Sequence, residues 1–192
     1  MSFFNNKMPV ETVVLIAALV AIASIGRIAF ASIASIQLAS FIIIMAGIIF
    51  GWRIGLIVGL LTPVVTDLMG MGLGSWTVFQ IIGWGLMGLS AGFLAQILIK
   101  NDIIGYISRG VFGFAWGFVY GWISNISMFF FMPDMDLSSF IGICITGFSF
   151  DLTHALTNLI ALTLLFELFR RIFVRAKKKF LPNISTTGIT KL

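Results

Sequence analysis

Six apolar segments follow one another along this chain, and Lys and Arg residues occur only in every second linker between them. The segments cover residues 10–31, 38–50, 54–69, 76–99, 103–131 and 140–169. Arg53 and Lys100 lie in the linkers after the second and fourth segments, Lys7 precedes the first, and a basic run beginning at Arg170 follows the last. Because Lys and Arg accumulate in cytoplasmic loops, this pattern predicts that both termini are cytoplasmic. An even number of spans agrees with that prediction.

The composition excludes a soluble domain. Hydrophobic residues make up 59% of the chain and charged residues 10%, with a mean hydropathy of +1.11. So few charged residues cannot cover the surface of a water-soluble domain of this size. Lipid offers no hydrogen-bond partner to an open sheet edge, so the spans must be helical. We therefore predict an all-α integral membrane protein, a bundle of six transmembrane helices with both termini cytoplasmic.

The segments form one predicted membrane domain, residues 1–176, followed by a basic, partly disordered cytoplasmic tail, residues 177–192. The first segment is longer than the apolar core of a signal peptide, and a single Lys precedes it, so we expect a mature helix. The second and third segments hold roughly 13 to 16 residues where about 20 cross a bilayer comfortably, so we expect them to be tilted, shielded by neighbours or able to thin the bilayer. The basic run is expected to contact anionic lipid rather than nucleic acid.

Glycines recur at four-residue intervals in four of the segments. Small residues at this spacing let helix backbones approach closely, which is how helices gain contact area inside a membrane. We therefore predict tight helix packing at these positions: Gly47 and Gly51, Gly55 and Gly59, Gly88 and Gly92, and Gly113, Gly117 and Gly121.

Polar residues within the segments gather toward the ends that lie away from the basic linkers. Arg109 lies near the start of the fifth segment and fits the charge pattern, whereas Arg27 is the exception, because it lies inside a span near its outer end. Buried ionisable groups are expensive in lipid and normally face a bundle interior, a partner or a water-filled cavity, so we expect a shared cavity open to the outside. The candidate substrate-binding residues are Arg27, Gln37, Asp67, Trp76, Gln80, Trp84, Asn125, Asp151, His154 and Asn158.

The candidates in the fourth and sixth segments each share one helix face. Asp151, His154 and Asn158 follow i, i+3, i+7 spacing, and two tryptophans flank Gln80 at four-residue intervals. Two such faces would offer stacking surfaces and hydrogen-bond partners to a flat or amide-bearing solute.

Structural roles compete with ligand contact at these positions. Arg27 pairing with Asp67 or Asp151 would hold the bundle together. His154 bonded to Asp151 would be a satisfied buried imidazole. The single cysteine, Cys144, excludes an internal disulfide and a cysteine-based zinc cluster.

Catalytic motifs are missing from the sequence. It contains no G-x-x-x-x-G-K-[ST] loop, no G-x-S-x-G elbow and no H-E-x-x-H pair, and it has one histidine. We therefore expect a non-enzymatic chain with no catalytic residues, no metal site and no intrinsic cofactor. Two alternatives stay open: an intramembrane enzyme using Asp151 and His154, and a stand-alone facilitator of small solutes. The lack of an evident inverted repeat and of polar residues in the inner halves disfavours the facilitator.

Several stretches resemble a known transporter family. These are "LIAALVAIAS", "GRIAFASIASIQ" and "FIIIMAGIIFGWRIGLIVGLLTPVVTDLMGMGLGSWTVFQIIGWGLMGLSAGF". Together with the six short segments they resemble the substrate-binding S component of an energy-coupling factor (ECF) type ABC vitamin transporter. The resemblance covers about residues 8–172, and its middle stretch is the most specific part.

The resemblance implies a division of labour between subunits in a bacterial cytoplasmic membrane. An S component captures a vitamin from the extracellular side, in a pocket formed by the outer parts of helices four to six and the loop between helices one and two. Its first helix docks on a transmembrane T component that two cytoplasmic ATPases drive, so ATP binds only to partner subunits. Ala17 and Ala21 would be that docking surface. Residues 32–38, with Gln37, would form a lid over the pocket, and residues 132–139 would form a second one.

The stretch "GSWTVFQIIGWGLMGLSAG" resembles S components assigned to cobalamin. Glycine-rich helices would leave room for a corrinoid, and the amides of Gln37, Gln80, Asn125 and Asn158 would suit its amide periphery. Cobalamin is therefore the favoured ligand. A queuosine precursor, pantothenate, pyridoxine, riboflavin and folate remain alternatives.

Overall fold

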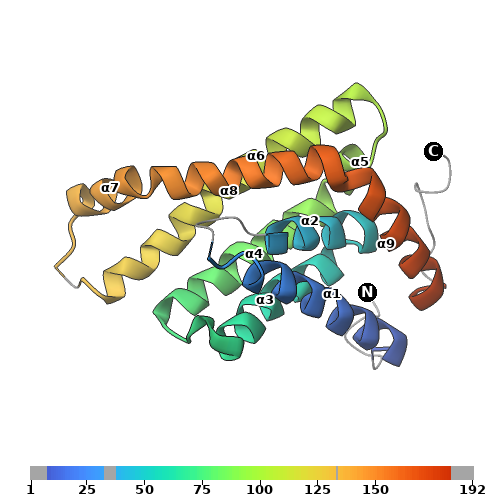
Figure 1. Cartoon of the computed structure of the whole chain (residues 1–192), viewed down its shortest axis with the longest axis horizontal. Coiled ribbons are helices and arrows are strands. Elements are labelled where there is room, and N and C mark those ends of the chain that lie inside the picture. Colours follow the sequence, from blue (N-terminus) through green and yellow to red (C-terminus); the bar gives the residue numbers. More distant parts are fainter. Residues whose placement is uncertain (1–7, 33–37, 133, 183–192) are drawn as a thin grey trace.

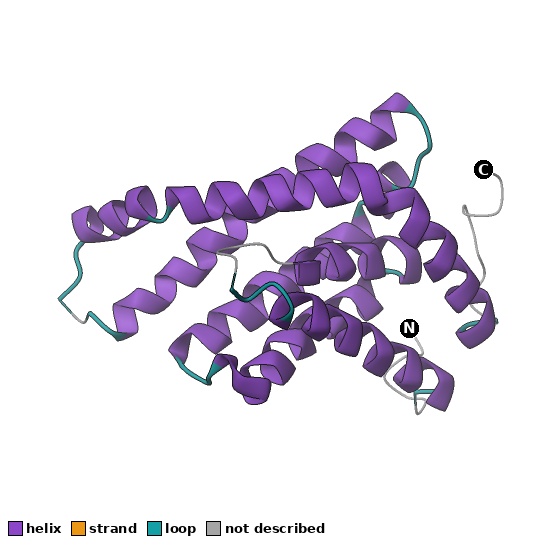
Figure 2. Ribbon diagram, viewed as in Figure 1, coloured by secondary structure: helices purple, strands orange, loops and turns teal. Residues whose placement is uncertain are grey.

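The computed structural model describes residues 8–32, 38–132 and 134–182, and every regular element in these ranges is helical (Figures 1 and 2). The α-helices are α1 (Val10–Ile28), α2 (Leu38–Phe50), α3 (Trp52–Thr66), α4 (Ser75–Phe93), α5 (Ala95–Leu98), α6 (Ile103–Asn125), α7 (Leu137–Thr146), α8 (Phe148–Ile160) and α9 (Phe166–Phe180). Three irregular helical turns connect some of them: η1 (Asp67–Met71), η2 (Ile126–Phe130) and η3 (Ala161–Leu165).

The all-helical prediction is confirmed for the described residues. Five helical runs are long and apolar enough to cross a membrane: Val10–Ile28, Trp52–Met71, Ser75–Phe93, Ile103–Phe130 and Leu137–Phe180. The prediction that the third segment is short is wrong, because η1 continues α3 into a run of 20 residues. The 13 residues of α2 remain below the length of a comfortable span, so the six-span count stays a prediction.

Helix α2 forms the centre of the bundle. Every residue from Ala39 to Phe50 is buried, and α1, α3, α4, α8 and α9 all contact it. A helix enclosed by protein need not match the bilayer thickness, which accounts for its shortness. At its end, Lys177 Nζ donates a hydrogen bond to the Ile49 carbonyl oxygen over 2.7 Å. Lysine thereby satisfies one of the carbonyls that a helix terminus leaves free.

Gly51 alone links α2 to α3. Its φ of +96° is a conformation that side chains rarely adopt, and it lets α3 begin at Trp52. The predicted packing role of Gly51 is wrong, because a Cβ there would meet nothing within 4 Å. Spacing alone did not separate a turn glycine from a packing glycine.

The other predicted packing glycines lie at close helix contacts. A Cβ on Gly55 would collide with the Gly88 carbonyl, and one on Gly59 would collide with the Trp84 backbone. These contacts press α3 against α4, and Gly47 and Gly92 make similar ones. The predicted packing is confirmed there.

Helices α6 and α8 meet along a second glycine row. Gly113, Gly117 and Gly121 on α6 face Asn158, Ala155 and Asp151 on α8, and a Cβ on any of the three glycines would meet the facing residues. We call these six residues the α6–α8 seam.

The last helical run, Leu137–Phe180, turns before its final helix. It passes from α7 through α8 and η3 and then turns, so that α9 lies beside α2 (Figure 1). Phe166 and Phe173 are buried, whereas Arg171 and Arg175 are exposed. Helix α9 passes Lys177, where the cytoplasmic tail was expected to begin; that domain boundary stays a prediction.

Candidate functional site

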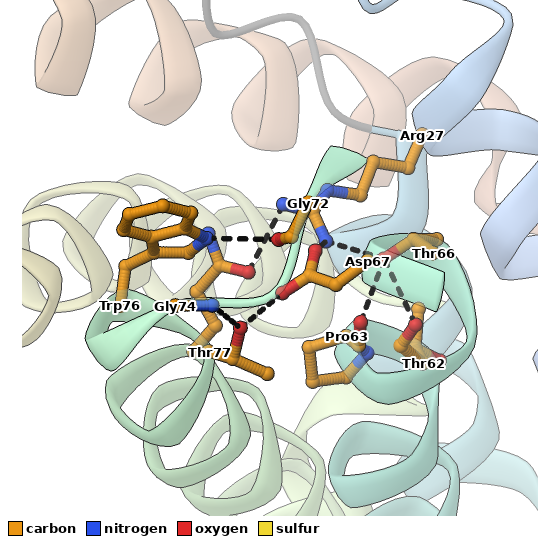
Figure 3. Close-up of polar contacts among 10 residues, drawn as sticks. Arg27, Thr62, Pro63, Thr66, Asp67, Gly72, Gly74, Trp76 and Thr77 are labelled. Carbon is orange, nitrogen blue, oxygen red and sulfur yellow. Dashed lines mark hydrogen bonds and ion pairs between the residues drawn. The ribbon is translucent and has the colours of Figure 1, made fainter. Parts of the chain in front are cut away.

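Arg27 joins three helical elements through its guanidinium. Its Nη1 donates to Asp67 Oδ1 over 3.0 Å and to Thr66 Oγ1, and its Nη2 donates to Gln80 Oε1 over 3.0 Å. Thr77 Oγ1 donates to the other carboxylate oxygen of Asp67 over 2.6 Å (Figure 3). We call these five residues the arginine network. Of the two pairings considered from the sequence, the structure has Arg27 with Asp67 and not with Asp151.

The turn between α3 and α4 positions this network. Gly70 and Gly72 have φ values of +123° and +85°, and they lie where the run formed by α3 and η1 ends, a few residues after Asp67. The Gly74 N–H then donates to Thr77 Oγ1 over 3.2 Å as α4 begins (Figure 3). The same hydroxyl donates onward to Asp67. The turn therefore brings the start of α4 onto the end of α3.

The arginine network lies in the interior. The side chain of Arg27 is 7% exposed and that of Asp67 is 0% exposed. Desolvating two charges is costly, and the cost is offset only when the pair is close and the remaining donors and acceptors are occupied. Both carboxylate oxygens of Asp67 are engaged here. The network therefore holds α1, α3 and α4 together.

A second cluster lies around Trp84, which is fully buried. Its Nε1 donates to Ser40 Oγ over 2.9 Å, and Ser40 Oγ lies 2.8 Å from His154 Nε2. The Tyr120 ring stacks on Trp84 at 5.0 Å and meets His154 edge-on at 5.1 Å. We call these four residues the tryptophan cluster; the Arg27 guanidinium lies 4.9 Å from the Trp84 ring centre and links it to the arginine network.

His154 thus bonds Ser40, and the considered pairing of His154 with Asp151 is not present. The predicted shared face of Asp151, His154 and Asn158 is correct, because all three are buried on α8. Asn158 Nδ2 donates to the Gly113 carbonyl across the α6–α8 seam over 3.2 Å. Asp151 packs against Gly121. Two buried acceptors, Asp151 Oδ2 and Asn158 Oδ1, have no hydrogen-bond partner among the described residues.

The remaining candidates lie outside both networks. Trp76 Nε1 donates to the Gly72 carbonyl over 3.2 Å, and its ring stacks on Phe131 at 5.8 Å. Asn125 is half-buried, with Nδ2 3.8 Å from Cys144 Sγ, a weak contact. Gln37 and most of the predicted lid 32–38 lie outside the described residues.

The second predicted lid, residues 132–139, is described apart from residue 133. Asp136 caps α7 by accepting a hydrogen bond from the Ser139 N–H over 2.8 Å, and it also accepts one from Ser138 Oγ. Hydrogen bonds from Ser139 and Ser138 lower the pKa of Asp136 to about 2. The cap therefore stays ionised at any physiological pH.

Sequence reasoning missed Ser40 and Tyr120. Ser40 is the one polar residue in α2, and an isolated hydroxyl in an otherwise apolar segment was a usable signal. Tyr120 lies among the aromatic residues of α6, and nothing in its spacing separates it from those that face outward.

The two networks and the α6–α8 seam bring most of the predicted site residues into one region of the bundle. This region combines aromatic faces with amide, hydroxyl, imidazole and carboxylate groups from five helices. Within the described part of the chain, no group of three His, Cys, Asp or Glu side chains is placed to hold a metal ion.

Helix α1 leaves one face uncovered. Ala17, Ala21 and Ile25 are exposed, whereas Leu15 and Leu19 on the other face are buried. The predicted docking residues are therefore accessible in the isolated chain. Their contact with a partner stays a prediction.

A family model described as "ECF transporter, substrate-specific component" matches residues 11–175, most of the chain. No curated protein and no solved structure matches the chain.

Proposed function

This chain belongs to the family of ECF transporter substrate-specific components, and from that premise we propose that it captures a vitamin from the extracellular side for ATP-driven import. Members of this family are substrate-binding subunits that work with a T component and ATPase subunits. The observation that carries the proposal is the gathering of Arg27, Gln80, Trp84, His154 and Asn158 in one region of a membrane bundle. Intramembrane polar groups in such number mark a solute path.

The proposed topology has six membrane crossings and both termini on the cytoplasmic side of a bacterial cytoplasmic membrane. The first turn of α1 and the last turn of α9 lie at the same end of the molecule, which supports it (Figure 1). The arginine network and the loop before α7 would then lie toward the outside, and Arg53, Lys100 and α9 toward the cytoplasm.

Cysteine labelling tests this topology. In a Cys144→Ser background, Asp134→Cys and Lys178→Cys each place a single thiol at an exposed position. A membrane-impermeant maleimide added to intact cells should label the cysteine at 134, and should label that at 178 only after permeabilisation. The reverse pattern would invert the proposed orientation.

We propose cobalamin as the ligand, with a queuosine precursor, pantothenate, pyridoxine, riboflavin and folate as alternatives. The amides of Gln80 and Asn158 and the stacked aromatic rings near Trp84 support a ligand with many hydrogen-bonding groups. The protein itself needs no further cofactor, and ATP would bind only to the partner ATPases.

Mass spectrometry of the small molecule that copurifies with the chain tests this function. We expect one vitamin-sized compound in stoichiometric amount, which then titrates back onto the emptied protein with saturable binding. A preparation that retains no solute and binds none of the six candidates would refute the proposal.

A further inference from the structure

The two buried polar atoms that lack a partner on α8 are both hydrogen-bond acceptors. Asp151 is 7% exposed and Asn158 is 0% exposed, and they lie two turns apart on one face. A buried acceptor without a donor is costly, and a carboxylate oxygen is the costlier of the two. A donor from outside the chain would remove that cost.

No cation of the described residues pairs with Asp151. The buried cation in this region, Arg27, is paired with Asp67, and His154, one turn along α8, directs Nε2 to Ser40. Among the described residues, no ion pair and no hydrogen bond is made to the Asp151 side chain, whose Oδ2 is left unmatched. Gly121 gives the carboxyl its space, since a Cβ there would collide with it.

The end of the seam beyond Asp151 is open to its surroundings. Helix α7, which precedes α8, buries no side chain, and Asn125 on α6 is only half-buried. Phe148, at the start of α8, is 53% exposed. In Figure 1, α7 and the last turns of α6 extend to the left of α1–α4. Asp151 therefore lies near the end of the seam that the other helices cover least.

We propose that Asp151 accepts a hydrogen bond from an N–H group of the transported solute, either an ammonium or a primary carboxamide. This inference rests on the proposed function and narrows the chemical class of the ligand. Arg27 is already paired with Asp67, so a carboxylate group of a solute would gain no ion pair with it, whereas an ammonium or carboxamide N–H would meet the unmatched acceptor of Asp151. Cobalamin, with its primary carboxamides, and an amine-bearing queuosine precursor carry such a donor, whereas pantothenate and folate carry neither an ammonium nor a primary carboxamide.

Isothermal titration of the purified chain in nanodiscs tests this assignment. The ligands are cyanocobalamin, 7-aminomethyl-7-deazaguanine, pyridoxine, riboflavin, pantothenate and folate. We expect the tightest of them to be one of the first two. Asp151→Leu should lower the affinity for that ligand by roughly fivefold or more, because the acceptor is lost.

Asp151→Asn separates the two donors. Asparagine keeps an acceptor oxygen but removes the charge. The affinity for an ammonium ligand should therefore fall about as far as in the Asp151→Leu variant, whereas the affinity for a carboxamide ligand should stay within roughly twofold of wild type. Asp102→Asn is the matched control, since asparagine also caps a helix and the site lies at the other end of α6. The Asp102→Asn variant should bind the ligand with wild-type affinity. Both Asp151 variants should melt no lower than the wild type, because a buried unpaired carboxylate is removed.

The outcomes separate this inference from the function on which it rests. If the tightest ligand is any of the other four compounds, or if the Asp151→Leu variant binds within roughly fivefold of wild type, the role of Asp151 is overturned and the function stands. Failure of the wild type to bind any of the six compounds overturns both.

Discussion

Two buried carboxylates in this bundle have opposite surroundings. Asp67 accepts hydrogen bonds at both oxygens and pairs with Arg27. Asp151 lies in a glycine seam with an oxygen that no described residue engages. Removing one partner of a buried ion pair destabilises a fold, whereas an unmatched buried carboxylate fits a role in binding.

Asp67→Asn should strongly destabilise the chain. The substitution leaves the Arg27 guanidinium buried without its counter-charge. We therefore expect the free energy of unfolding to fall by about 3 to 5 kcal/mol. Glu167→Gln is the matched control, because its pair with Arg170 is partly exposed and its loss should cost about 0 to 1 kcal/mol. Chemical and thermal unfolding in one detergent compare the two. Equal loss in both variants would contradict a structural role for the Arg27–Asp67 pair.

Sequence reasoning predicted which residues share a face but not which residues pair. The i, i+3, i+7 spacing of Asp151, His154 and Asn158 placed them together correctly, because helix geometry is local. The partners of Arg27 and His154 depend on how α1 packs on α3 and how α2 packs on α8. Those contacts are set by tertiary packing, so several pairings were equally compatible with the sequence.

At the scale of elements, glycine decides how closely the helices approach. At the α6–α8 seam the backbones of the two helices are in contact, and Asp151 and Asn158 lie within this seam. The four-residue spacing predicted these contacts without any knowledge of which helix would face which. It failed at Gly51, where a positive φ and not close packing requires glycine.

Gly117→Ala should loosen the seam. The Cβ of the introduced alanine would collide with the Ala155 backbone. We expect this overpacking to lower the free energy of unfolding by about 1 to 3 kcal/mol. Gly142→Ala on α7 is the matched control, because a Cβ there meets open space and alanine favours the helix by about 1 kcal/mol. Melting temperatures of the two variants in the same detergent should move in opposite directions. A fall of the same size in both would show that close approach at Gly117 is not what stabilises the bundle.

At the scale of the whole molecule, one bundle combines an enclosed helix with an uncovered one. Helix α2 is buried on all sides, whereas α1 exposes Ala17 and Ala21. The charge pattern and the family resemblance predicted a membrane bundle and its family. The enclosure of α2 was one of three explanations offered for its short length, because apolarity alone does not separate a helix that faces lipid from one that faces protein.

Ala17→Trp and Ala21→Trp should block assembly with the T component and leave solute binding intact. Both positions are exposed, so the isolated chain has room for the indole, but close approach of a partner helix is lost. Val111→Trp on α6, at a position that is 62% exposed, is the control. Copurification with the T component and ATPases measures assembly. Full assembly by both alanine variants would remove this surface as the docking site.

Solute uptake into proteoliposomes tests the central claim most directly. The compound identified by copurification is supplied outside vesicles that hold this chain alone, or this chain with its T component and ATPases, with ATP inside. We predict binding but no accumulation by the chain alone, and ATP-dependent accumulation by the complex. Accumulation by the chain alone, or none by an assembled and ATP-hydrolysing complex, would contradict the claim that this chain is the solute-binding subunit of an importer.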